Sequence, residues 1–348
     1  MTSDNSTIWS APANIALVKY WGKHGDQLPQ NPSISITLSE SITTTRIEWT
    51  KAIATPEHKF EFEDREEPVF EKKVMTYLNK VGPLLPELTG YSLNISSRNN
   101  FPHSSGISSS ASFMASMALC LIRAEEKISG ATLPADDFYR KASNLARLGS
   151  GSAARSVYSG YTLWGKTGAI QDSSDDFAVQ INDQVHPVFK TYRDAILVVS
   201  SQPKMLSSTA GHGLMQSNPY AETRYEVARK NINLLLSTLK SGDQESFIRI
   251  IEEEALTLHG LILSSSGGPI LLEPASISII RLIRDYRIQT GSKLCFTLDA
   301  GPNIHLLYPE SESAQIMNFI GHSLAGYCEN QRWIPDLIGE GSKELIGF

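Results

Sequence analysis

A hydroxyl-rich segment in the first third of the chain contains the residue types that bind phosphate. Residues 98–111 read RNNFPHSSGISSSA, so Pro102 and Gly106 interrupt a run of serines. An apolar stretch typical of a helix, residues 113–122, follows directly. A loop that leads into a helix presents free backbone N–H groups and the positive end of the helix dipole to an anion. A surface helix capped by serine has the same pattern. This segment alone therefore fits either a phosphate-binding loop or an ordinary capped helix.

Three further segments carry charged groups beside turns or small residues. Residues 13–23, ANIALVKYWGK, predict a strand that delivers Lys19 and Lys23, either to an anionic ligand or to the solvated surface. Residues 149–156, GSGSAARS, predict either a flexible turn or a site where backbone amides and Arg155 bind phosphate. Residues 299–303, DAGPN, place the carboxylate of Asp299 at the end of an apolar strand, on a rigid turn that also fits an Asx turn.

Hydrophobic periodicity predicts the elements that position these segments. Alternation of apolar and polar residues, or a short apolar run, predicts strands at 34–38, 43–49, 91–95, 157–164, 195–199, 293–298 and 304–308. Helical spacing predicts helices at 70–81, 134–149, 221–240, 245–263, 276–288 and 314–324. A serine-rich loop is expected at 207–211.

Length and composition restrict the class of protein. A chain of 348 residues exceeds the size at which one core stays efficient, which predicts two domains, residues 1–185 and 186–348. The net charge of −6 argues against a nucleic-acid or membrane partner. The polar first ten residues predict no signal peptide, so a cytoplasmic enzyme is expected. Three widely spaced cysteines fit neither a disulfide framework nor a zinc site.

Two short motifs are coincidental matches. Residues 160–167, GYTLWGKT, fit the Walker A pattern, but the motif itself has the pattern of a strand and no helix is expected after it. Residues 201–204, SQPK, and 166–168, KTG, match parts of the penicillin-binding signature in the wrong order. The histidines show no metal-ligand spacing, so we expect no protein-bound zinc.

Taken together, the four segments resemble the diphosphomevalonate decarboxylase family, within the superfamily of galactokinase, homoserine kinase and mevalonate kinase. The matching motifs are NIAxxKYWGK at 14–23, NNFP at 99–102, GSGSAxR at 149–155 and DAGPN at 299–303. They occur in the order and at the spacing typical of that family. Residues 207–211, SSTAG, are similar to its mobile substrate loop.

The resemblance implies ATP-dependent decarboxylation of mevalonate 5-diphosphate to isopentenyl diphosphate, with Mg²⁺ as cofactor. Hydroxide is a poor leaving group, so the 3-hydroxyl must first become a phosphate ester. Asp299 would accept the hydroxyl proton, and Lys19 would keep this carboxylate ionised, since a nearby cation lowers a carboxyl pKa by about 1–3. Decarboxylation of mevalonate 5-phosphate, a 3-kinase activity and a non-catalytic binding protein on the same fold are the alternatives.

The resemblance also implies which residues hold the ligands, with Lys19 and Asp299 as the catalytic pair. The substrate would be bound by Asn14, Tyr20, Trp21, Gly22, Lys23, Ser150, Gly151, Ser152, Ala153, Ala154, Arg155 and Ser208. The ATP phosphates would be bound by Ser104, Ser105, Gly106, Ser108, Ser109 and Ser110, with Ser109 or Ser110 also on Mg²⁺.

The fold that this resemblance implies is α+β with two domains, as in the small-molecule kinases. The N-terminal half would be similar to domain 2 of ribosomal protein S5 and the C-terminal half to ferredoxin, with the site between them. A homodimer is implied as well. The chain departs from the family at residues 103–105, HSS in place of the usual TAA, and at His212, where methionine is common.

Overall fold

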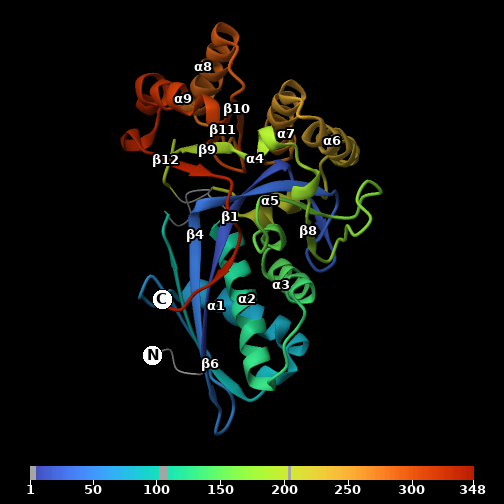
Figure 1. Cartoon of the computed structure of the whole chain (residues 1–348), viewed down its shortest axis with the longest axis vertical. Helices are drawn as coiled ribbons and strands as arrows, with labels where there is room; N and C mark the ends of the chain where they lie inside the picture. The colour runs from blue at the N-terminus through green and yellow to red at the C-terminus, as the bar shows by residue number, and fades with distance from the viewer. Residues whose placement is uncertain (1–4, 102–108, 203–204) are drawn as a thin grey trace.

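The computed structural model describes residues 5–101, 109–202 and 205–348. These residues form two α+β parts, each built on its own antiparallel or mostly antiparallel sheet (Figure 1). The expected α+β class is therefore confirmed. The N-terminal sheet and its helices lie below the C-terminal sheet in the view of Figure 1, and the C-terminal end of the chain lies beside the lower part.

The larger sheet contains seven strands, and its path runs β13-β1-β4-β6-β5 with β7 and β8 attached to β4. β4 pairs with β1 from Ser6↔Glu48 to Val18↔Ile34. Every residue of β1 is buried, and in β4 buried and partly buried residues alternate from Ser41 to Trp49. The strands are β1 (Ser6–Val18), β4 (Ser33–Lys51), β5 (Lys59–Phe62), β6 (Tyr91–Asn99), β7 (Tyr161–Trp164), β8 (Ala178–Gln180) and β13 (Lys343–Glu344). A separate hairpin joins β2 (Lys23–His24) and β3 (Leu28–Pro29).

β4 corrects one expectation, because the strands predicted at 34–38 and 43–49 form a single strand. The pairing register of β1 and β4 shifts between them, at Pro12 and Asn14. The N–H groups of Ser39, Glu40 and Ser41 are accepted there by the carboxylate of Asp336 at 2.8–3.0 Å. The irregular turn of the backbone therefore keeps its hydrogen bonds, and the strand continues through it.

Three helices cover one face of this sheet: α1 (Pro68–Val81), α2 (Ser109–Ser129) and α3 (Ala135–Gly149) (Figure 1). The apolar spacing predicted for α1 is confirmed, since Val74, Tyr77, Leu78 and Val81 are buried in it. α2 is buried on nearly every side because it lies between the sheet and α3. Its first residue follows directly on residues 102–108, outside the described part of the chain.

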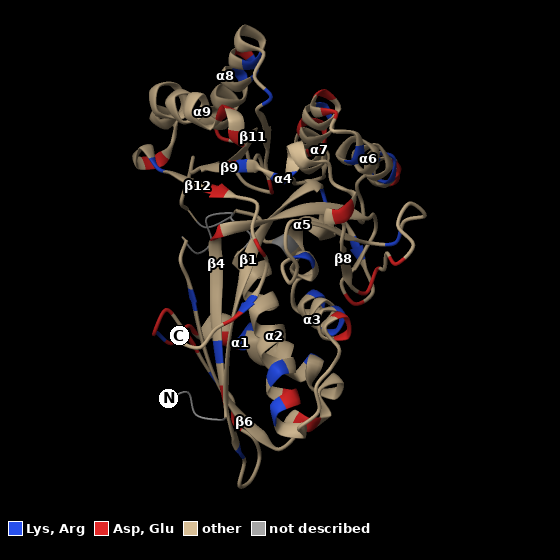
Figure 2. Cartoon of the chain, viewed as in Figure 1, with Lys and Arg blue, Asp and Glu red and all other residues tan. Residues whose placement is uncertain are grey.

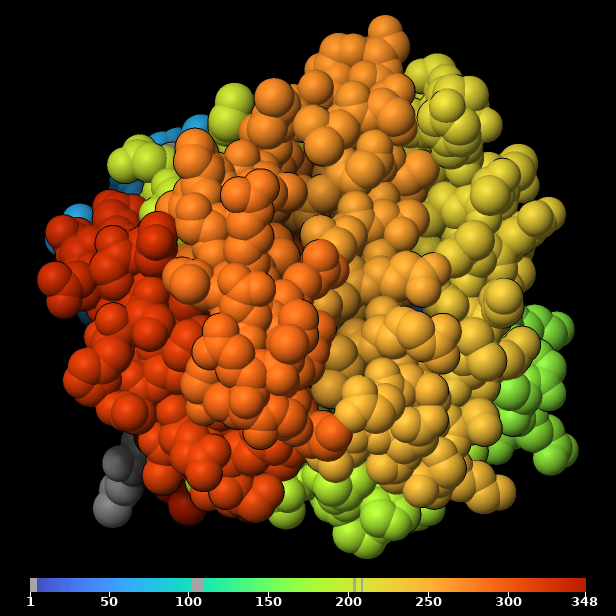
Figure 3. Space-filling model, turned by 90° about the horizontal axis from the view of Figure 1, so that it is seen from above, coloured from blue at the N-terminus to red at the C-terminus, as the bar shows by residue number. Residues whose placement is uncertain are grey.

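The C-terminal part has a four-stranded antiparallel sheet in the order β10-β11-β9-β12. Its strands are β9 (Tyr192–Leu197), β10 (Cys295–Thr297), β11 (Ile304–Pro309) and β12 (Trp333–Leu337). Its helices are α4 (Pro187–Lys190), α5 (Ser208–Leu214), α6 (Ala221–Ser241), α7 (Gln244–Ser264), α8 (Pro274–Thr290) and α9 (Ser313–Phe319). Seen from above in Figure 3, α6 to α9 cover this end of the molecule.

Three further segments differ from their predicted structure. The strand expected at 157–164 is limited to β7, because residues 151–155 form a 3-10 turn and residues 156–160 continue as a turn. The loop expected at 207–211 is the start of α5, because the Ser207 side chain accepts the N–H of Ala210 and caps a helix. The helix expected at 314–324 is α9 followed by a turn of π-helix, Ile320–Leu324. No helix begins directly after the Walker-like segment, as expected, because residues 165–177 form turns and bends that lead into β8.

The two parts share an apolar core. Ile15, Leu17 and Ile36 of the larger sheet pack in one cluster with residues of β9, α6 and α7. The end of the chain also joins the parts, since β13 pairs with β1 although it belongs to the segment 186–348. Acidic and basic residues are interspersed over both parts (Figure 2). Among the described residues, no helix is long and apolar enough to cross a bilayer.

Candidate functional site

A cleft of about 1010 Å³ lies where the end of β1, helix α1, the turn after α3, helix α5 and the turn after β10 meet. Six basic side chains line it: Lys19, Lys23, Lys72, Lys73, Lys80 and Arg155. Asp299 is the single acidic residue among the described residues that line it. Because the whole chain carries a net charge of −6, this local excess of cations indicates a site for a strongly anionic ligand.

Lys19 and Asp299 meet in this cleft although 280 positions separate them in the sequence. The Lys19 Nζ lies 3.2 Å from Asp299 Oδ1. The lysine side chain is 2% exposed and that of the aspartate 26%, so the carboxylate faces the cleft and the ammonium lies behind it. Burial lowers the pKa of Lys19, while Asp299 and Glu254 oppose that shift. The contact that the resemblance implied is present.

The turn that bears Asp299 is fixed on several sides. The Asn303 side chain accepts the N–H of Ser200 at 2.9 Å and donates to its carbonyl at 3.0 Å, which attaches the turn to the end of β9. The Ser276 hydroxyl donates to the Pro302 carbonyl at 2.7 Å. These backbone contacts fix the turn, and the Lys19 ammonium contacts the carboxylate directly, so the two together hold the Asp299 side chain in place.

Arg155 lies on the 3-10 turn Gly151–Arg155 and lines the same cleft as Lys19 and Asp299. Its Nη1 donates to Ser33 Oγ at 2.6 Å and its Nε to Ser35 Oγ at 3.0 Å, so neutral hydroxyls hold the guanidinium. Burial lowers its pKa to about 10, so it remains a cation at neutral pH. Asn14 donates to Ser156 Oγ at 2.7 Å and thereby ties β1 to the turn.

The residues after Lys19 present polar groups without protein partners. The Tyr20 hydroxyl and the Trp21 indole N–H are buried and have no hydrogen-bond partner among the described residues. Both residues line the cleft, and a buried donor without an acceptor is a site for a ligand oxygen. Gly151 leaves the space for Tyr20, because a Cβ there would lie 2.7 Å from the tyrosine oxygen.

Helix α1 supplies cleft residues that were not predicted. Its apolar residues pack on the sheet, while Val69, Lys72, Lys73, Thr76 and Lys80 lie on the side that faces the cleft. The helical spacing of these residues is visible in the sequence, opposite to the apolar positions. These residues have the pattern of an ordinary solvated helix face. They line the cleft only because β1, α5 and the turn after β10 are placed next to this face in the tertiary structure.

Helix α5 contacts the loop after Lys19 through His212. The Nδ1 of His212 accepts the N–H of Gly22 at 2.9 Å, and its ring packs against those of Tyr20 and Trp21. Burial lowers the pKa of His212 to about 3, with a smaller effect of Lys23. The side chain is therefore neutral, as its role as an acceptor requires.

The remaining predicted residues are placed as follows. Ser150, Gly151 and Ser152 line the cleft with Lys23, whereas Ala153 and Ala154 are buried in the core and Gly22 turns the chain with φ +95°. Ser109 and Ser110 begin α2, and Ser110 lines the cleft. Ser104, Ser105, Gly106 and Ser108, together with the Ser208 side chain, lie outside the described part of the chain.

The described residues offer no metal cage of their own, since no group of three His, Cys, Asp or Glu side chains among them could hold an ion. Mg²⁺ commonly binds through one or two protein groups plus substrate phosphates and waters. Ser110 and Asp299, which line one cleft, fit that mode of binding.

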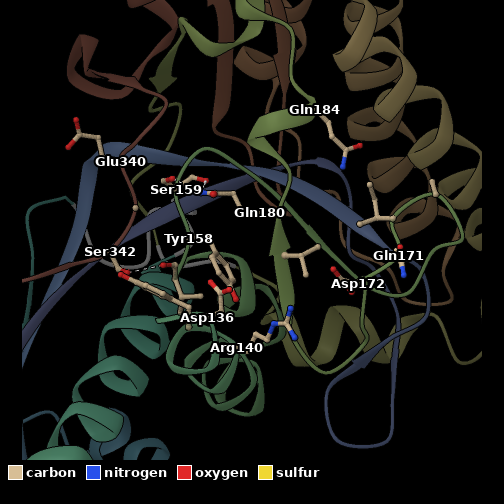
Figure 4. Close-up of a pocket in the computed structure, with 16 residues that line it drawn as sticks. Asp136, Arg140, Tyr158, Ser159, Gln171, Asp172, Gln180, Gln184, Glu340 and Ser342 are labelled. Atoms are coloured by element: carbon tan, nitrogen blue, oxygen red, sulfur yellow. Dashed lines mark hydrogen bonds between the residues drawn. The ribbon is translucent and has the colours of Figure 1, made fainter. Parts of the chain in front are cut away.

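A second hollow of about 620 Å³ lies away from this cleft (Figure 4). Asp136, Arg140 and Tyr158 form one side of it, and Asp172 and Glu340 also line it. It contains three acidic residues and one arginine, the opposite charge balance to the first cleft. None of the residues predicted for the site lies in it.

Comparison with known proteins assigns both halves of the chain to one family. Residues 11–176 match the model of the diphosphomevalonate decarboxylase-like N-terminal domain, and residues 195–338 match that of the mevalonate 5-diphosphate decarboxylase C-terminal domain. The diphosphomevalonate decarboxylase of Eremothecium gossypii is 32% identical over 341 residues, which cover 93% of this chain and 82% of that protein.

Solved structures agree over nearly the whole length. Mevalonate diphosphate decarboxylase from Staphylococcus aureus superposes with a TM-score of 0.83 at 26% identity, covering 98% of both chains. A structure described as MDDEF in complex with MVAPP, AMPPCP and magnesium has a TM-score of 0.82 at 27% identity, also covering 98% of both chains.

Proposed function

The chain belongs to the diphosphomevalonate decarboxylase family, and from that membership we propose that it decarboxylates mevalonate 5-diphosphate to isopentenyl diphosphate with ATP. ADP, phosphate and carbon dioxide are the other products. The observation that carries the proposal is the contact of Lys19 with Asp299 in a cationic cleft.

The chemistry follows from the positions of these two groups. Asp299 accepts the proton of the substrate 3-hydroxyl while the hydroxyl oxygen attacks the γ-phosphorus of ATP and ADP leaves. The bond from the carboxylate carbon to carbon 2 then breaks, its electrons form the double bond to carbon 3, and phosphate leaves carbon 3. Lys19, buried behind Asp299, keeps the carboxylate ionised and stabilises charge on the transferred phosphoryl group.

The remaining cleft residues bind the anionic parts of the substrates. We assign the substrate diphosphate and carboxylate to Lys23, Arg155, Ser150, Ser152 and the Tyr20 hydroxyl, which line the cleft together. The residues that the family resemblance adds to this set are Asn14, Trp21, Gly22, Gly151, Ala153, Ala154 and Ser208. The three alanine and glycine positions 151, 153 and 154 contribute close packing or backbone amides.

ATP is assigned to the segment before α2 and to the first turn of that helix. Ser109 or Ser110 would hold Mg²⁺ bound to the ATP phosphates. When bound, Mg²⁺ neutralises the negative charge that builds up on the phosphates during transfer. Ser104, Ser105, Gly106 and Ser108 complete the proposed phosphate-binding segment.

The direct test uses purified protein with ATP, Mg²⁺ and mevalonate 5-diphosphate, and measures ADP and carbon dioxide together. We expect one carbon dioxide for each ADP. ADP without carbon dioxide would identify a 3-kinase, and turnover of mevalonate 5-phosphate alone would identify the decarboxylase of the shorter substrate. No turnover of any of these substrates would contradict the proposal.

We further propose a cytoplasmic homodimer whose chain divides at residue 185 into the two domains predicted from the sequence. The support is the family resemblance and, for the division, the polar segment 172–176 before it. Sedimentation equilibrium tests the oligomeric state, and a monomer at micromolar concentration would contradict it.

A further inference from the structure

Helix α7 passes behind the cleft and touches the backbone of both residues of the catalytic pair. Glu254 and His259 lie five positions apart in it, which is about 7.5 Å along the helix axis. Leu258, between them, lines the cleft itself. Neither Glu254 nor His259 lines the cleft, so any effect on the reaction has to pass through the groups they hold.

Glu254 fixes the peptide group of Lys19. Its Oε2 accepts the Lys19 N–H at 2.9 Å and a hydrogen bond from Arg224 Nη2 at 2.6 Å. Its Oε1 accepts from Arg224 Nη1 at 3.0 Å and from Asn231 at 2.7 Å. The carboxylate therefore has four donors, and the side chains of Arg224 and Glu254 are both 0% exposed.

The carbonyl of Lys19 is held by the same network. Arg224 Nη2 donates to it at 3.3 Å and Asn31 Nδ2 at 3.0 Å. A buried ion pair adds little net stability on average compared with apolar residues of the same volume. The Arg224–Glu254 ion pair instead contacts both the N–H and the carbonyl of Lys19, which indicates that it positions the backbone of Lys19.

His259 fixes the peptide group of Asp299. Its Nε2 lies 3.0 Å from the Asp299 carbonyl oxygen, and because a carbonyl only accepts, the ring must carry its proton on Nε2. The N–H of Gly301 donates to the same carbonyl at 2.8 Å. His259 is 3% exposed, so water does not replace this contact easily.

We propose that α7 sets the geometry of the Lys19–Asp299 pair, with Glu254 positioning the lysine backbone and His259 positioning the aspartate backbone. The proposal rests on the proposed function, since it concerns the same reaction. One rigid helix thus holds two chain segments that belong to different halves of the sequence. Glu254 and His259 are positioning residues, and an error of about 1 Å in such geometry can lower a rate by about 100-fold.

Two substitutions of His259 test the aspartate side. The amide nitrogen of glutamine reaches the position of Nε2 and can donate to the Asp299 carbonyl, whereas leucine cannot donate. We expect His259→Leu to lower kcat about 10- to 100-fold with KM for both substrates within about 3-fold. We expect His259→Gln to stay within about 3-fold of the wild type.

Glu254→Gln tests the lysine side, and Glu253→Gln is its matched control because Glu253 is the adjacent, exposed residue. The first should lower kcat without raising KM, and the second should leave both unchanged. Thermal unfolding and the Kd of a non-hydrolysable ATP analogue show whether each variant is folded. If Glu254→Gln does not fold, the His259 variants decide the question.

The proposal is overturned if His259→Leu keeps the wild-type kcat, if His259→Gln loses as much as His259→Leu, or if the losses appear in KM and not in kcat. These outcomes leave the proposed function intact, because they require a wild-type enzyme that turns over. A wild-type protein without turnover contradicts the proposed function instead.

Discussion

Replacement of Asp299 by asparagine removes the base and the counter-charge while it keeps the shape of the side chain. The amide cannot accept the proton of the substrate hydroxyl. General base catalysis contributes about 10²- to 10⁴-fold, and the loss of charge beside Lys19 adds to that effect. We therefore expect kcat to fall by about 10³-fold or more.

Asp299→Asn should lower the free energy of unfolding only moderately. At 3.2 Å and an effective dielectric constant of about 20, Coulomb's law gives about 5 kcal/mol for the pair. The side chain of Asp299 is 26% exposed, so water screens part of this energy. Lys19 can also lose its proton, because burial already lowers its pKa. We expect the free energy of unfolding to fall by about 1–2 kcal/mol, which leaves the enzyme folded.

A coupled assay of ADP release gives kcat, calorimetry gives the Kd of an ATP analogue, and urea unfolding gives the stability. The matched control is Asp183→Asn, an exposed aspartate outside the cleft, which should match the wild type. The reasoning is refuted if Asp299→Asn keeps more than a tenth of the wild-type kcat while the protein binds nucleotide normally.

Three other changes test the site and its support. Gly151→Ala places a Cβ 2.7 Å from the Tyr20 oxygen; we expect KM for mevalonate 5-diphosphate to rise about 10-fold, and an unchanged KM would contradict this. Asp336→Ala leaves three backbone N–H groups of β4 without their acceptor, so the free energy of unfolding in urea should fall by about 3 kcal/mol; a loss below about 1 kcal/mol would show that water replaces the carboxylate. Burial lowers the pKa of His212 to about 3 in the folded protein, from about 6.5 for an unperturbed histidine in the unfolded chain. The unfolded chain therefore binds one more proton than the folded protein between these pH values. Stability due to His212 is therefore lost as pH falls below 6.5, by about 2 kcal/mol at pH 5. Urea unfolding of His212→Met should depend less on pH over this range, and parallel curves would contradict the assignment.

Local elements could be predicted where one physical signal dominates. The apolar spacing of α1 and the Gly82-Pro83 pair that follows it were enough to place that helix. The short helix α5 was missed because residues 207–211 contain the small polar residues of a loop, and the capping role of Ser207 is visible only when its side chain is seen to accept a backbone N–H.

The meeting of Lys19 and Asp299 could be expected only through the resemblance to a family. No periodicity or spacing relates two residues that lie 280 positions apart. For Lys72, Lys73 and Lys80 of α1, the helical spacing was visible in the sequence. The sequence did not show that this face of the helix lines a cleft. A polar helix face becomes a binding surface only when another part of the chain is placed against it.

Glu254 could have been recognised as unusual from the sequence. It occupies a position of α7 where the helical repeat of Phe247, Ile250, Ile251 and Leu258 predicts a core residue. A glutamate at such a position requires buried donors. Its partners are Lys19, which follows β1, and two residues of α6, and only the tertiary fold brings them together. The sequence therefore indicates that Glu254 needs a partner but does not identify it.

The most direct test is a crystal structure of the enzyme with mevalonate 5-diphosphate, Mg²⁺ and a non-hydrolysable ATP analogue. We expect the substrate 3-hydroxyl within hydrogen-bond distance of a carboxylate oxygen of Asp299, with the terminal phosphorus in line beyond it. The diphosphate should contact Arg155 or Lys23. A substrate bound in this cleft with its 3-hydroxyl remote from Asp299, or bound in another part of the molecule, would contradict the account.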